Sequence, residues 1–331
     1  MVIAYANYLA KQGHDVALYT NIKNTLFFIS PKVKIKKIPF PGKLGTILWA
    51  LLHRVKADII VADIIVLAII LSIKHRKKVV YFAQDYDVSY YPDKLRQKII
   101  ELIYLIGLKL FKLPCIAVSD TLKEELKPYE KRITVIYNGI DPNVFYPDPD
   151  PGLLTQKANR KAILIFGRKD PRKGLDMALK VLSNLTKKID PQTLEVWVVG
   201  SKIVEDILPC KVRNFGYVDE NKLRKILSSA DVFFYPSRHE GLPLFVLETL
   251  ACRCPVVTTK AVGMLSNLNG VFASNINDEK ALTLDLLNIL AQPDKFHNLN
   301  NKNLFLTKFN LDKQKRLFEF HLLKMAGLVN E

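Results

Sequence analysis

Residues 232–251 read VFFYPSRHEGLPLFVLETLA and indicate a strand that passes through a turn into a helix. The run at residues 232–235 is short and built of aromatic and β-branched residues, as buried strands are. Pro243 suits the first turn of a helix, so we expect a helix over residues 243–251. A strand followed directly by a helix is the repeating unit of parallel α/β sheets.

The same alternation extends along the 331-residue chain. In the first half we expect strands at residues 15–20, 32–38, 59–62, 79–83, 115–119 and 134–137, and helices at 1–12, 44–56 and 94–113. In the second half we expect strands at 162–166, 194–199, 232–235 and 256–259, helices at 174–186, 221–229, 243–251 and 278–291, and mostly helical sequence from 302 to the end. This order predicts parallel sheets covered by helices on both faces.

A proline-rich stretch divides the two halves. Four prolines fall within residues 141–151, which leaves no room there for a regular element. We therefore expect an N-terminal domain at 1–141, a linker at 142–160, a C-terminal domain at 161–310, and a C-terminal helix at 311–331 that crosses back to the first domain. The predicted fold class is α/β, with two Rossmann-like, doubly wound parallel sheets facing a cleft; ligands bind outside the carboxyl ends of such strands.

The charge is strongly positive, with 49 Lys and Arg against 32 Asp and Glu and a net charge of +17. Residues 1–56 hold nine basic residues and one acidic residue, Asp15. This excess fits an acidic membrane surface, which attracts each nearby Lys or Arg by about 1 kcal/mol, and fits a solvated lysine-rich surface equally well. Nucleic acid is not expected, because the basic residues are not interleaved with aromatic residues and no nucleic-acid-binding signature is present.

The four cysteines are scattered along the chain, and no second pair at metal-ligand spacing accompanies Cys252 and Cys254. We expect no metal and a reducing compartment. The N-terminal residues Met1-Val2-Ile3-Ala4 include no basic region of the kind that begins a signal peptide. The longest apolar run, at residues 64–73, is about half the ~20 residues that a spanning helix needs, and Asp58 and Asp63 precede it. We therefore expect a cytoplasmic location, with peripheral contact to the inner face of the membrane left open.

Two cations follow the strand expected at residues 162–166. Arg168 lies just past its end, and Lys173 lies five residues further, before Gly174 and a helix. A diphosphate leaving group gathers negative charge as its bond to a sugar breaks, and fixed cations stabilise that charge. Taken alone, the two cations fit a basic surface loop slightly better.

Residues 240–248 combine a helix start with two carboxylates. The helix N-terminus attracts phosphate, and Gly241 lets a ligand approach the backbone closely. Glu240 precedes the helix and Glu248 lies on its second turn, where each can accept hydrogen bonds from sugar or ribose hydroxyls. The alternative is that Glu240 caps the helix and Glu248 forms a surface ion pair.

Together these motifs resemble those of the retaining glycosyltransferases called group 1, similar to family 4, which have the two-domain GT-B fold. The resemblance covers nearly the whole chain and is densest over residues 134–273. The matching motifs are Asn138-Gly139-Ile140-Asp141 with Phe145, Gly167-Arg168 with Lys173-Gly174, Val199-Gly200, Phe215-Gly216-Tyr217-Val218, Glu240-Gly241-Leu242-Pro243 with Glu248, Pro255-Val256-Val257, and Asn269-Gly270.

The resemblance implies a role for each matched residue. Arg168 and Lys173 would hold the diphosphate, Glu240 would touch the donor sugar, and Glu248 would bind ribose hydroxyls. The remaining nucleotide contacts would come from Gly167, Gly200, Gly216, Val218, Gly241, Leu242, Pro243 and Leu244. The resemblance also implies retention of configuration, no metal or other cofactor, and transfer from a nucleotide-diphosphate sugar to a polysaccharide or lipid-linked acceptor.

The sequence departs from the family at three places. The motif Gly13-His14-Asp15-Val16 is present, but the strand and Gly-Gly turn that precede it in relatives are not, so we expect a late or truncated start. Gln84 and Asp85 stand where relatives often place a catalytic-site histidine; Gln can bond a sugar hydroxyl but cannot carry a proton. In the third departure, Val262-Gly263-Met264 replaces a Gly-Gly turn that is usually followed by an acidic residue in relatives, and Arg253 replaces a common glycine before Pro255.

Two other functions stay open. A nucleotide-sugar epimerase or hydrolase shares the fold but needs a proton-moving or water-activating carboxylate, and the candidates are Asp85 and Glu240. A catalytically impaired or truncated relative would bind nucleotide without transferring sugar. The sequence identifies neither the donor base and sugar, nor the acceptor, nor the oligomeric state.

The helices expected at 44–56 and 94–113 mix apolar and basic residues, as interfacial helices do. The second carries an apolar stripe at Leu95, Ile99, Leu102, Ile106, Leu110 and Leu113 and basic residues at Lys94, Arg96, Lys98, Lys109 and Lys112. Because parallel sheets need helices to cover them, we expect the stripe to pack in the core. The basic rows would remain available to acidic lipid.

Overall fold

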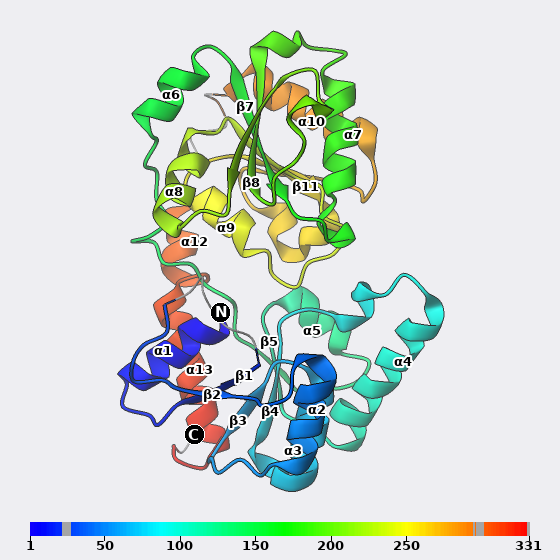
Figure 1. The fold of residues 1–331 in the computed structure, drawn as a ribbon, viewed down its shortest axis with the longest axis vertical. Helices are drawn as coiled ribbons and strands as arrows, with labels where there is room; N and C mark the ends of the chain where they lie inside the picture. The colour runs from blue at the N-terminus through cyan, green and yellow to red at the C-terminus, as the bar shows by residue number, and fades with distance from the viewer. Residues whose placement is uncertain (22–27, 294, 296–300, 330–331) are drawn as a thin grey trace. The chain divides into compact units, whose positions relative to one another are not determined.

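The computed structural model describes residues 1–21, 28–293, 295 and 301–329 (Figure 1). The chain divides into two compact units: unit 1 comprises residues 1–138 and 311–331, and unit 2 comprises residues 139–310. The stretch expected as a linker, 142–160, lies within unit 2 and holds a helix, α6 (Pro151–Lys157). Proline is tolerated there because it occupies the start of the helix, where Asp150 caps the amide of Leu153.

Unit 2 is built on one parallel sheet of six strands. They are β7 (Lys161–Gly167), β8 (Leu194–Gly200), β9 (Lys211–Gly216), β10 (Val232–Tyr235), β11 (Val256–Thr259) and β12 (Val271–Ser274). Their order across the sheet is β12-β11-β10-β7-β8-β9, so the winding reverses between β7 and β10. The sequence patterns did not predict β9 and β12, which are partly exposed at the two edges.

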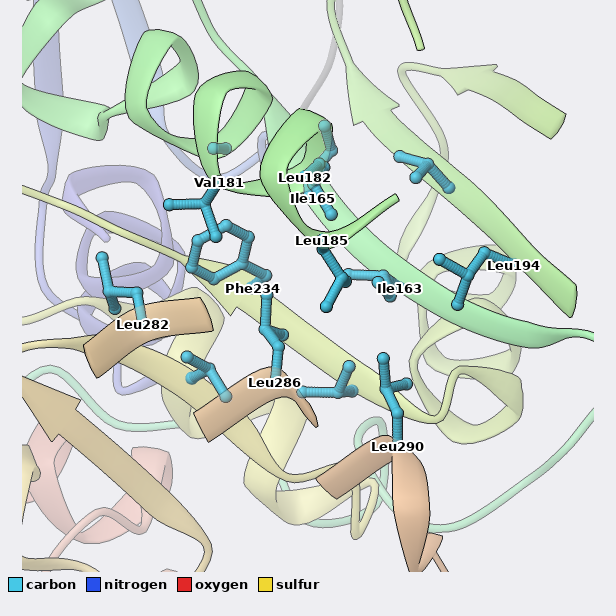
Figure 2. Packing of buried hydrophobic residues seen from close by; sticks show 14 of the residues in the cluster. Ile163, Ile165, Val181, Leu182, Leu185, Leu194, Phe234, Leu282, Leu286 and Leu290 are labelled. Carbon is cyan, nitrogen blue, oxygen red and sulfur yellow. The ribbon is translucent and has the colours of Figure 1, made fainter. Parts of the chain in front are cut away.

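Alternating side chains of these strands enter two different cores. Ile163, Ile165 and Phe234 pack with helices α7 (Leu175–Leu185) and α10 (Glu279–Ala291) on one face (Figure 2). On the other face, Phe166 and Phe233 pack on Phe245 of α9 (Leu244–Ala251), which lies beside α8 (Glu220–Ser229). The strands are therefore buried on both faces, as parallel sheets require.

Unit 1 holds two parallel sheets. The smaller pairs β1 (Ala17–Thr20) with β2 (Lys34–Lys37). The larger has the order β3-β4-β5-β6, with β3 (Ile60–Ala62), β4 (Val79–Ala83), β5 (Cys115–Ala117) and β6 (Ile133–Val135). The helices are α1 (Val2–Lys11), α2 (Gly42–Leu52), α3 (Ile65–His75), α4 (Lys94–Tyr104) and α5 (Asp120–Leu126).

A cavity of about 580 Å³ lies between the two sheets of unit 1. Its walls include β1 and β3 along their edges, α1 on one side and α2 and α3 on another. Among the described residues, no strand pairs with both β1 and β3. The two sheets are consequently joined through the packing of helices rather than through backbone hydrogen bonds.

The last helices fall in different units. α12 (Lys302–Thr307) belongs to unit 2, and α13 (Leu311–Met325) belongs to unit 1, where it packs on α1. Phe318 of α13 stacks near Tyr5, with ring centroids 4.3 Å apart, and near Phe82 of β4 at 5.3 Å. Residues 330–331, at the end of the helical stretch expected from the sequence, lie outside the described residues.

The expectation that the apolar stripe of the helix at 94–113 packs in the core is wrong for Leu95, Ile99, Leu102 and Leu110, which are exposed, whereas Ile106 is partly buried and Leu113 is 3% exposed. The stretch forms α4 and then a π-helix, η3 (Leu105–Leu110), and Tyr104 is the only residue of α4 that is fully buried. Leu95 is 71% exposed and Leu102 is 54% exposed. The buried side chains of this stretch are Tyr104, Leu108 and Leu113, so the side of the helix that carries Leu95 and Leu102 does not cover the sheet. No helix among the described residues is long and apolar enough to span a bilayer.

Candidate functional site

The candidate site of unit 2 lies where the winding of the sheet reverses. β7 and β10 are neighbours there, with Val232 opposite Ile163. The chain leaves β7 at Gly167 and β10 at Tyr235, and both strands end at the same edge of the parallel sheet. Crevices at such switch points are the usual binding sites of open α/β sheets.

Two loops leaving these strands are joined to each other. The loop after β7 contains a short 3₁₀ helix, η4 (Pro171–Lys173), and its Arg172 carbonyl accepts a hydrogen bond from the Arg238 amide at 2.7 Å. Gly174 has a φ of 69°, and a Cβ there would lie 1.9 Å from the Pro236 carbonyl oxygen. The two loops thus approach so closely that only glycine fits at position 174.

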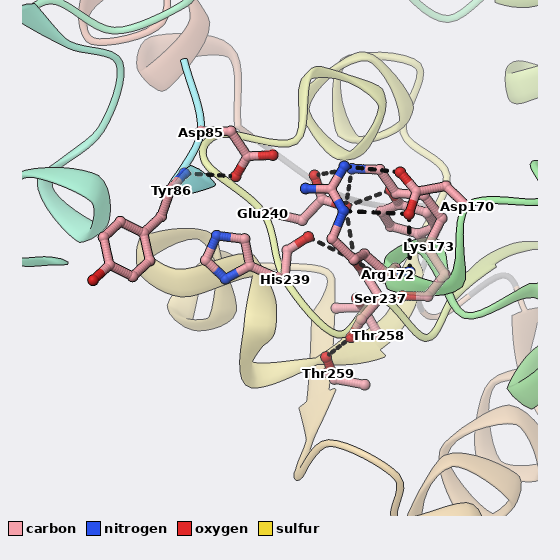
Figure 3. A network of polar contacts seen from close by, with 11 residues as sticks. Asp85, Tyr86, Asp170, Arg172, Lys173, Ser237, His239, Glu240, Thr258 and Thr259 are labelled. Atoms are coloured by element: carbon pink, nitrogen blue, oxygen red, sulfur yellow. Dashed lines mark hydrogen bonds and ion pairs between the residues drawn. The ribbon is translucent and has the colours of Figure 1, made fainter. Parts of the chain in front are cut away.

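A buried carboxylate stands at the centre of this junction (Figure 3). Glu240 is 6% exposed, and the Lys173 ammonium donates to both of its oxygens at 2.9 Å. The hydroxyls of Tyr235 and Ser237 donate to Glu240 Oε1 at 2.5 and 2.7 Å. Burial raises the pKa of Tyr235, and the neighbouring carboxylate raises it further, so this hydroxyl keeps its proton and remains a donor.

Arg238 braces the same junction from outside. Its guanidinium bonds both oxygens of Asp176, at 2.8 and 2.7 Å, and the Pro171 carbonyl at 2.6 Å. The hydrogen bonds from Arg238 lower the pKa of Asp176. This fork-to-fork pair fixes the first turn of α7 against the loop after β10.

Arg168 differs from Lys173 in its surroundings. It follows β7 directly and its side chain is exposed, whereas the Lys173 side chain is 11% exposed. One cation is therefore fixed by a buried partner, and the other extends into solvent at the same strand end. A ligand that binds here would meet one buried, paired positive charge and one exposed positive charge.

The helix start predicted from the sequence follows Glu240. Gly241, Leu242 and Pro243 are buried, and α9 begins at Leu244, one residue later than expected, with Pro243 as its N-cap. The first turn of any α-helix presents amide groups that lack partners within the helix. The helix thus directs its positive end toward the edge of the sheet where β10 ends.

Glu248 lies on the second turn of α9 and keeps part of its surface exposed. Despite that exposure, desolvation raises the pKa of its carboxyl to about 8, and the charge of Glu220 adds to the shift. A carboxyl with such a pKa is largely protonated at pH 7. Hydrogen bonds donated by ligand hydroxyls would favour the charged carboxylate, which is the better acceptor.

The predicted glycines end the neighbouring strands. Gly167 and Gly200 lie opposite each other at the ends of β7 and β8, and the Ser201 amide donates to the Gly167 carbonyl at 2.5 Å. Gly216 ends β9 with a φ of 70°, and Val218 follows it, partly buried. These residues line the same carboxyl edge of the sheet as the two loops.

Gln84 and Asp85 belong to unit 1. They follow β4 at its carboxyl end, where both are partly buried and Asp85 accepts a hydrogen bond from the Tyr86 amide at 3.0 Å. The predicted site residues are thus divided between the two units. Within the described residues, no group of three or more His, Cys, Asp and Glu side chains is placed to hold a metal ion.

Sequence reasoning missed the residues that support the site. Tyr235 and Ser237 hold Glu240, and Arg238 holds the α7 turn. Their signal was available, because all three stand in the strand-to-helix stretch that includes Glu240. Hydroxyl and guanidinium donors beside a buried carboxylate are the partners that such a carboxylate needs.

Comparisons with known proteins match nearly the whole chain. A model described as Glycosyltransferase Family 4 matches residues 1–144, and a model described as Glycosyl transferases group 1 matches residues 160–292. An O-antigen chain mannosyltransferase of Salmonella typhimurium is 26% identical over 244 residues, covering 69% of this chain and 64% of that protein. Two further curated relatives are matched over 46% and 44% of their length, so the chain spans about half to two thirds of the length of these three relatives.

Solved structures share the fold of the chain. A sucrose-phosphate synthase of Thermosynechococcus elongatus has a TM-score of 0.81 at 18% identity, covering 99% of this chain and 93% of that chain. The Anabaena protein HepE, solved with UDP and glucose, has a TM-score of 0.75 at 18% identity, covering 98% and 95%. The two units are the two Rossmann-like domains of the GT-B fold, and the chain belongs to the group 1, family 4-like glycosyltransferases.

Proposed function

We propose that this protein transfers a sugar from a nucleotide-diphosphate sugar to a saccharide or lipid-linked acceptor, with retention of configuration and without a metal. The observation that carries the proposal is the Lys173–Glu240 pair, which fixes a cation at the switch point between β7 and β10. A nucleotide diphosphate is the ligand whose charge such a cation complements.

The proposed donor contacts follow from the geometry. Lys173, held in place by Glu240, and Arg168, exposed at the same strand end, neutralise the charge that develops on the departing diphosphate. The N-terminus of α9 adds its dipole to the same task. Glu240 lies beside Lys173 and presents its carboxylate to the hydroxyls of the donor sugar. Glu248 accepts hydrogen bonds from the ribose hydroxyls.

The proposed chemistry needs no protein base. The bond between the anomeric carbon and the phosphate oxygen breaks, and the acceptor oxygen bonds to the same face of that carbon. The proton of the acceptor hydroxyl passes to the leaving phosphate oxygen. This route is supported by the state of Glu240, whose carboxylate already accepts from Lys173, Tyr235 and Ser237 and is poorly suited to take a proton.

We propose UDP as the nucleotide to test first, because HepE was solved with UDP and with UDP-glucose. Transfer at the cytoplasmic side of the membrane is part of the proposal. It is supported by the net charge of +17 and by four cysteines that are all buried, unpaired thiols.

The test is calorimetric titration with UDP, GDP and dTDP. We expect one nucleotide to bind the wild type, and the double variant Arg168→Ala with Lys173→Ala to bind it at least about 100-fold more weakly, because charge-assisted hydrogen bonds contribute roughly 1.5–3 kcal/mol each. The control is Lys187→Ala with Lys188→Ala, two exposed cations of the same unit, which should bind as the wild type does. If well-folded protein binds none of the three, the proposal is wrong.

Turnover separates transfer from its alternatives. Sugar released from the bound donor without any acceptor would indicate a hydrolase, and a changed donor sugar would indicate an epimerase. Nucleotide binding without turnover across a panel of saccharide and lipid-linked acceptors would indicate an impaired relative.

A further inference from the structure

The outer side of α4 presents a row of apolar side chains to solvent. Leu95, Ile99 and Leu102 are spaced four and three residues apart and are 71%, 49% and 54% exposed. The row continues past the helix with Leu110 and Phe111. A helix that covers a sheet ordinarily turns its apolar stripe inward, so this orientation leaves the stripe without a partner in unit 1.

A second apolar row lies on α2, in the same layer of helices. Leu44, Leu48 and Leu52 are exposed, whereas Trp49 and Ala50 face inward. α3 packs against α2 and also against α4, which lie near it in Figure 1, and against η3. Its Ile73 is also exposed. Because the inward residues of α2 and α4 are the buried ones, both rows lie on the solvent side of this layer.

Basic residues accompany both rows. Lys98 lies three residues after Leu95 and four before Leu102, so it neighbours both on the helix surface. Lys94, Lys98, Lys109 and Lys112 are exposed, and none pairs with an acidic side chain in the described part of the chain. On α2, Lys43 precedes Leu44 and is exposed as well.

We propose that the solvent side of α2, α3, α4 and η3 docks on an anionic lipid bilayer. The apolar rows enter the boundary between headgroups and acyl chains, and the lysines reach the acidic headgroups from the edges of the rows, since long side chains can extend their charge while burying their stems. The unpaired lysines favour a lipid surface over a protein surface, because protein interfaces are depleted in lysine. Scattered exposed apolar residues need no explanation, but rows that continue over neighbouring helices mark an interaction surface.

This inference deepens the proposed function and rests on it in one respect: contact with a bilayer serves sugar transfer only if the protein is a glycosyltransferase. The donor contacts proposed above all lie in unit 2, so the proposal leaves the acceptor to unit 1. Docking through its helix layer brings that half to a bilayer, where a lipid-linked acceptor resides. The docking itself does not depend on nucleotide binding, so the two proposals can fail separately.

The experiment is co-sedimentation of the full chain with vesicles. One set contains phosphatidylcholine alone and the other contains phosphatidylglycerol as well, each at about 0.05 M and about 0.5 M salt, because higher salt shortens the reach of the charges. We expect binding to the anionic vesicles at low salt, weaker binding at high salt, and little binding to the neutral vesicles. Absence of binding to anionic vesicles at low salt would overturn the proposal.

Two pairs of variants locate the contact. Leu95→Gln with Leu102→Gln should weaken vesicle binding about tenfold or more, because the variant lacks the apolar area that the two leucines move from water into the bilayer. Its control is Leu284→Gln with Leu306→Gln, two leucines of unit 2 that are 58% and 50% exposed. Lys98→Gln with Lys109→Gln should weaken binding at low salt by about fivefold for each lysine, and Lys187→Gln with Lys188→Gln serves as its control.

Three outcomes separate the explanations. Equal losses in the control variants would mean that the surface is not the one proposed. If light scattering shows a dimer that Leu95→Gln with Leu102→Gln converts to monomer while vesicle binding persists, the rows join two copies of this chain and the proposal is wrong. UDP titration of the same samples reports on the donor site alone, so vesicle binding without nucleotide binding would contradict only the proposed function.

Discussion

The Lys173 ammonium and the Glu240 carboxylate stabilise each other only while both are charged and in contact. They come from loops separated by 67 residues, and they meet because β7 and β10 are neighbours in the sheet. Tyr235 and Ser237 complete the hydrogen bonds of the carboxylate. The buried charge is therefore compensated, as a buried charge must be.

Removing the ammonium should destabilise unit 2 more than removing the pair. Lys173→Met leaves Glu240 buried with two hydroxyl donors, and breaking a buried pair in this way costs about 3–5 kcal/mol. Adding Glu240→Gln should restore part of that loss. Urea unfolding of the single and double variants measures both values; an unchanged midpoint for Lys173→Met would mean that the pair does not form in solution.

Glu248 should make nucleotide binding depend on pH. Its pKa is raised to about 8, so the carboxylate that would accept ribose hydroxyls forms as the pH rises through that value. If only the charged form accepts these bonds, affinity should rise by roughly eightfold between about pH 7 and about pH 8.5. Glu248→Gln should bind the nucleotide more weakly at about pH 8.5, and its affinity should change with pH only through the protonation of the nucleotide itself. Calorimetric titration of both proteins with nucleotide at several pH values across this range measures the difference.

The same raised pKa affects folding. The unfolded carboxyl loses its proton near its usual value of 4.5, whereas the folded one holds it to about 8, so this group lowers stability as pH rises between the two values. Glu248→Gln removes that penalty. Its unfolding midpoint should exceed that of the wild type at about pH 8 by more than at about pH 5.

The sequence was sufficient to select Arg168, Lys173, Glu240 and Glu248 but not to show which of them touch. They were selected from their spacing within single loops and helices, which can be read directly from the local sequence. The contact of Lys173 with Glu240 depends on the pairing of strands far apart in the chain. The individual roles of these residues stay predictions until nucleotide binding is measured.

Gly174 controls how closely two elements approach. Its left-handed backbone starts α7 while the Pro236 carbonyl fills the space of a side chain. Gly174→Ala should cost about 2–4 kcal/mol, from backbone strain and overpacking, and should weaken nucleotide binding by displacing Lys173. Gly152→Ala, in the first turn of α6, is the control and should change unfolding by less than about 1 kcal/mol; equal effects would contradict the close approach.

The buried strands of unit 2 were easier to predict than its edge strands. Continuous apolar runs mark strands buried on both faces, and β7, β8, β10 and β11 have such runs. The edge strands β9 and β12 lack them and were missed. In α4, periodicity correctly indicated a helix, but it could not indicate which side faces the sheet, because a row that meets a lipid surface and a row that meets a core have the same spacing.

At its C-terminal end the chain returns to its first unit. α13 lies beyond unit 2 in sequence and yet packs on α1 and β4 of unit 1. Glu319 of α13 accepts from Tyr8 at 2.9 Å and contacts the His14 ring nitrogen at 2.7 Å. Proline and glycine patterns placed the domain boundary near its position, at 138–139 in the structure, but nothing in them specified the partners of α13.

Phe318 should stabilise unit 1 alone. Phe318→Ala removes the ring that packs on Tyr5 and Phe82, at a cost of about 3–5 kcal/mol. Phe320, on the same helix and 48% exposed, provides the control, and Phe320→Ala should cost less than about 1 kcal/mol. Calorimetry should show a lower transition for unit 1 in the first variant, with nucleotide affinity unchanged; a loss of affinity would show that the two units are coupled.

The return of α13 also sets an order of events at the ribosome. When residue 138 has been synthesised, unit 1 still lacks the helix that covers Tyr5 and Phe82, and residues 139–331 take roughly 10–40 s to follow at ordinary translation rates. Unit 2 is complete at residue 310, before α13 exists. The second half of the protein can thus finish folding first, while the first half waits with its aromatic surface uncovered and within reach of chaperones.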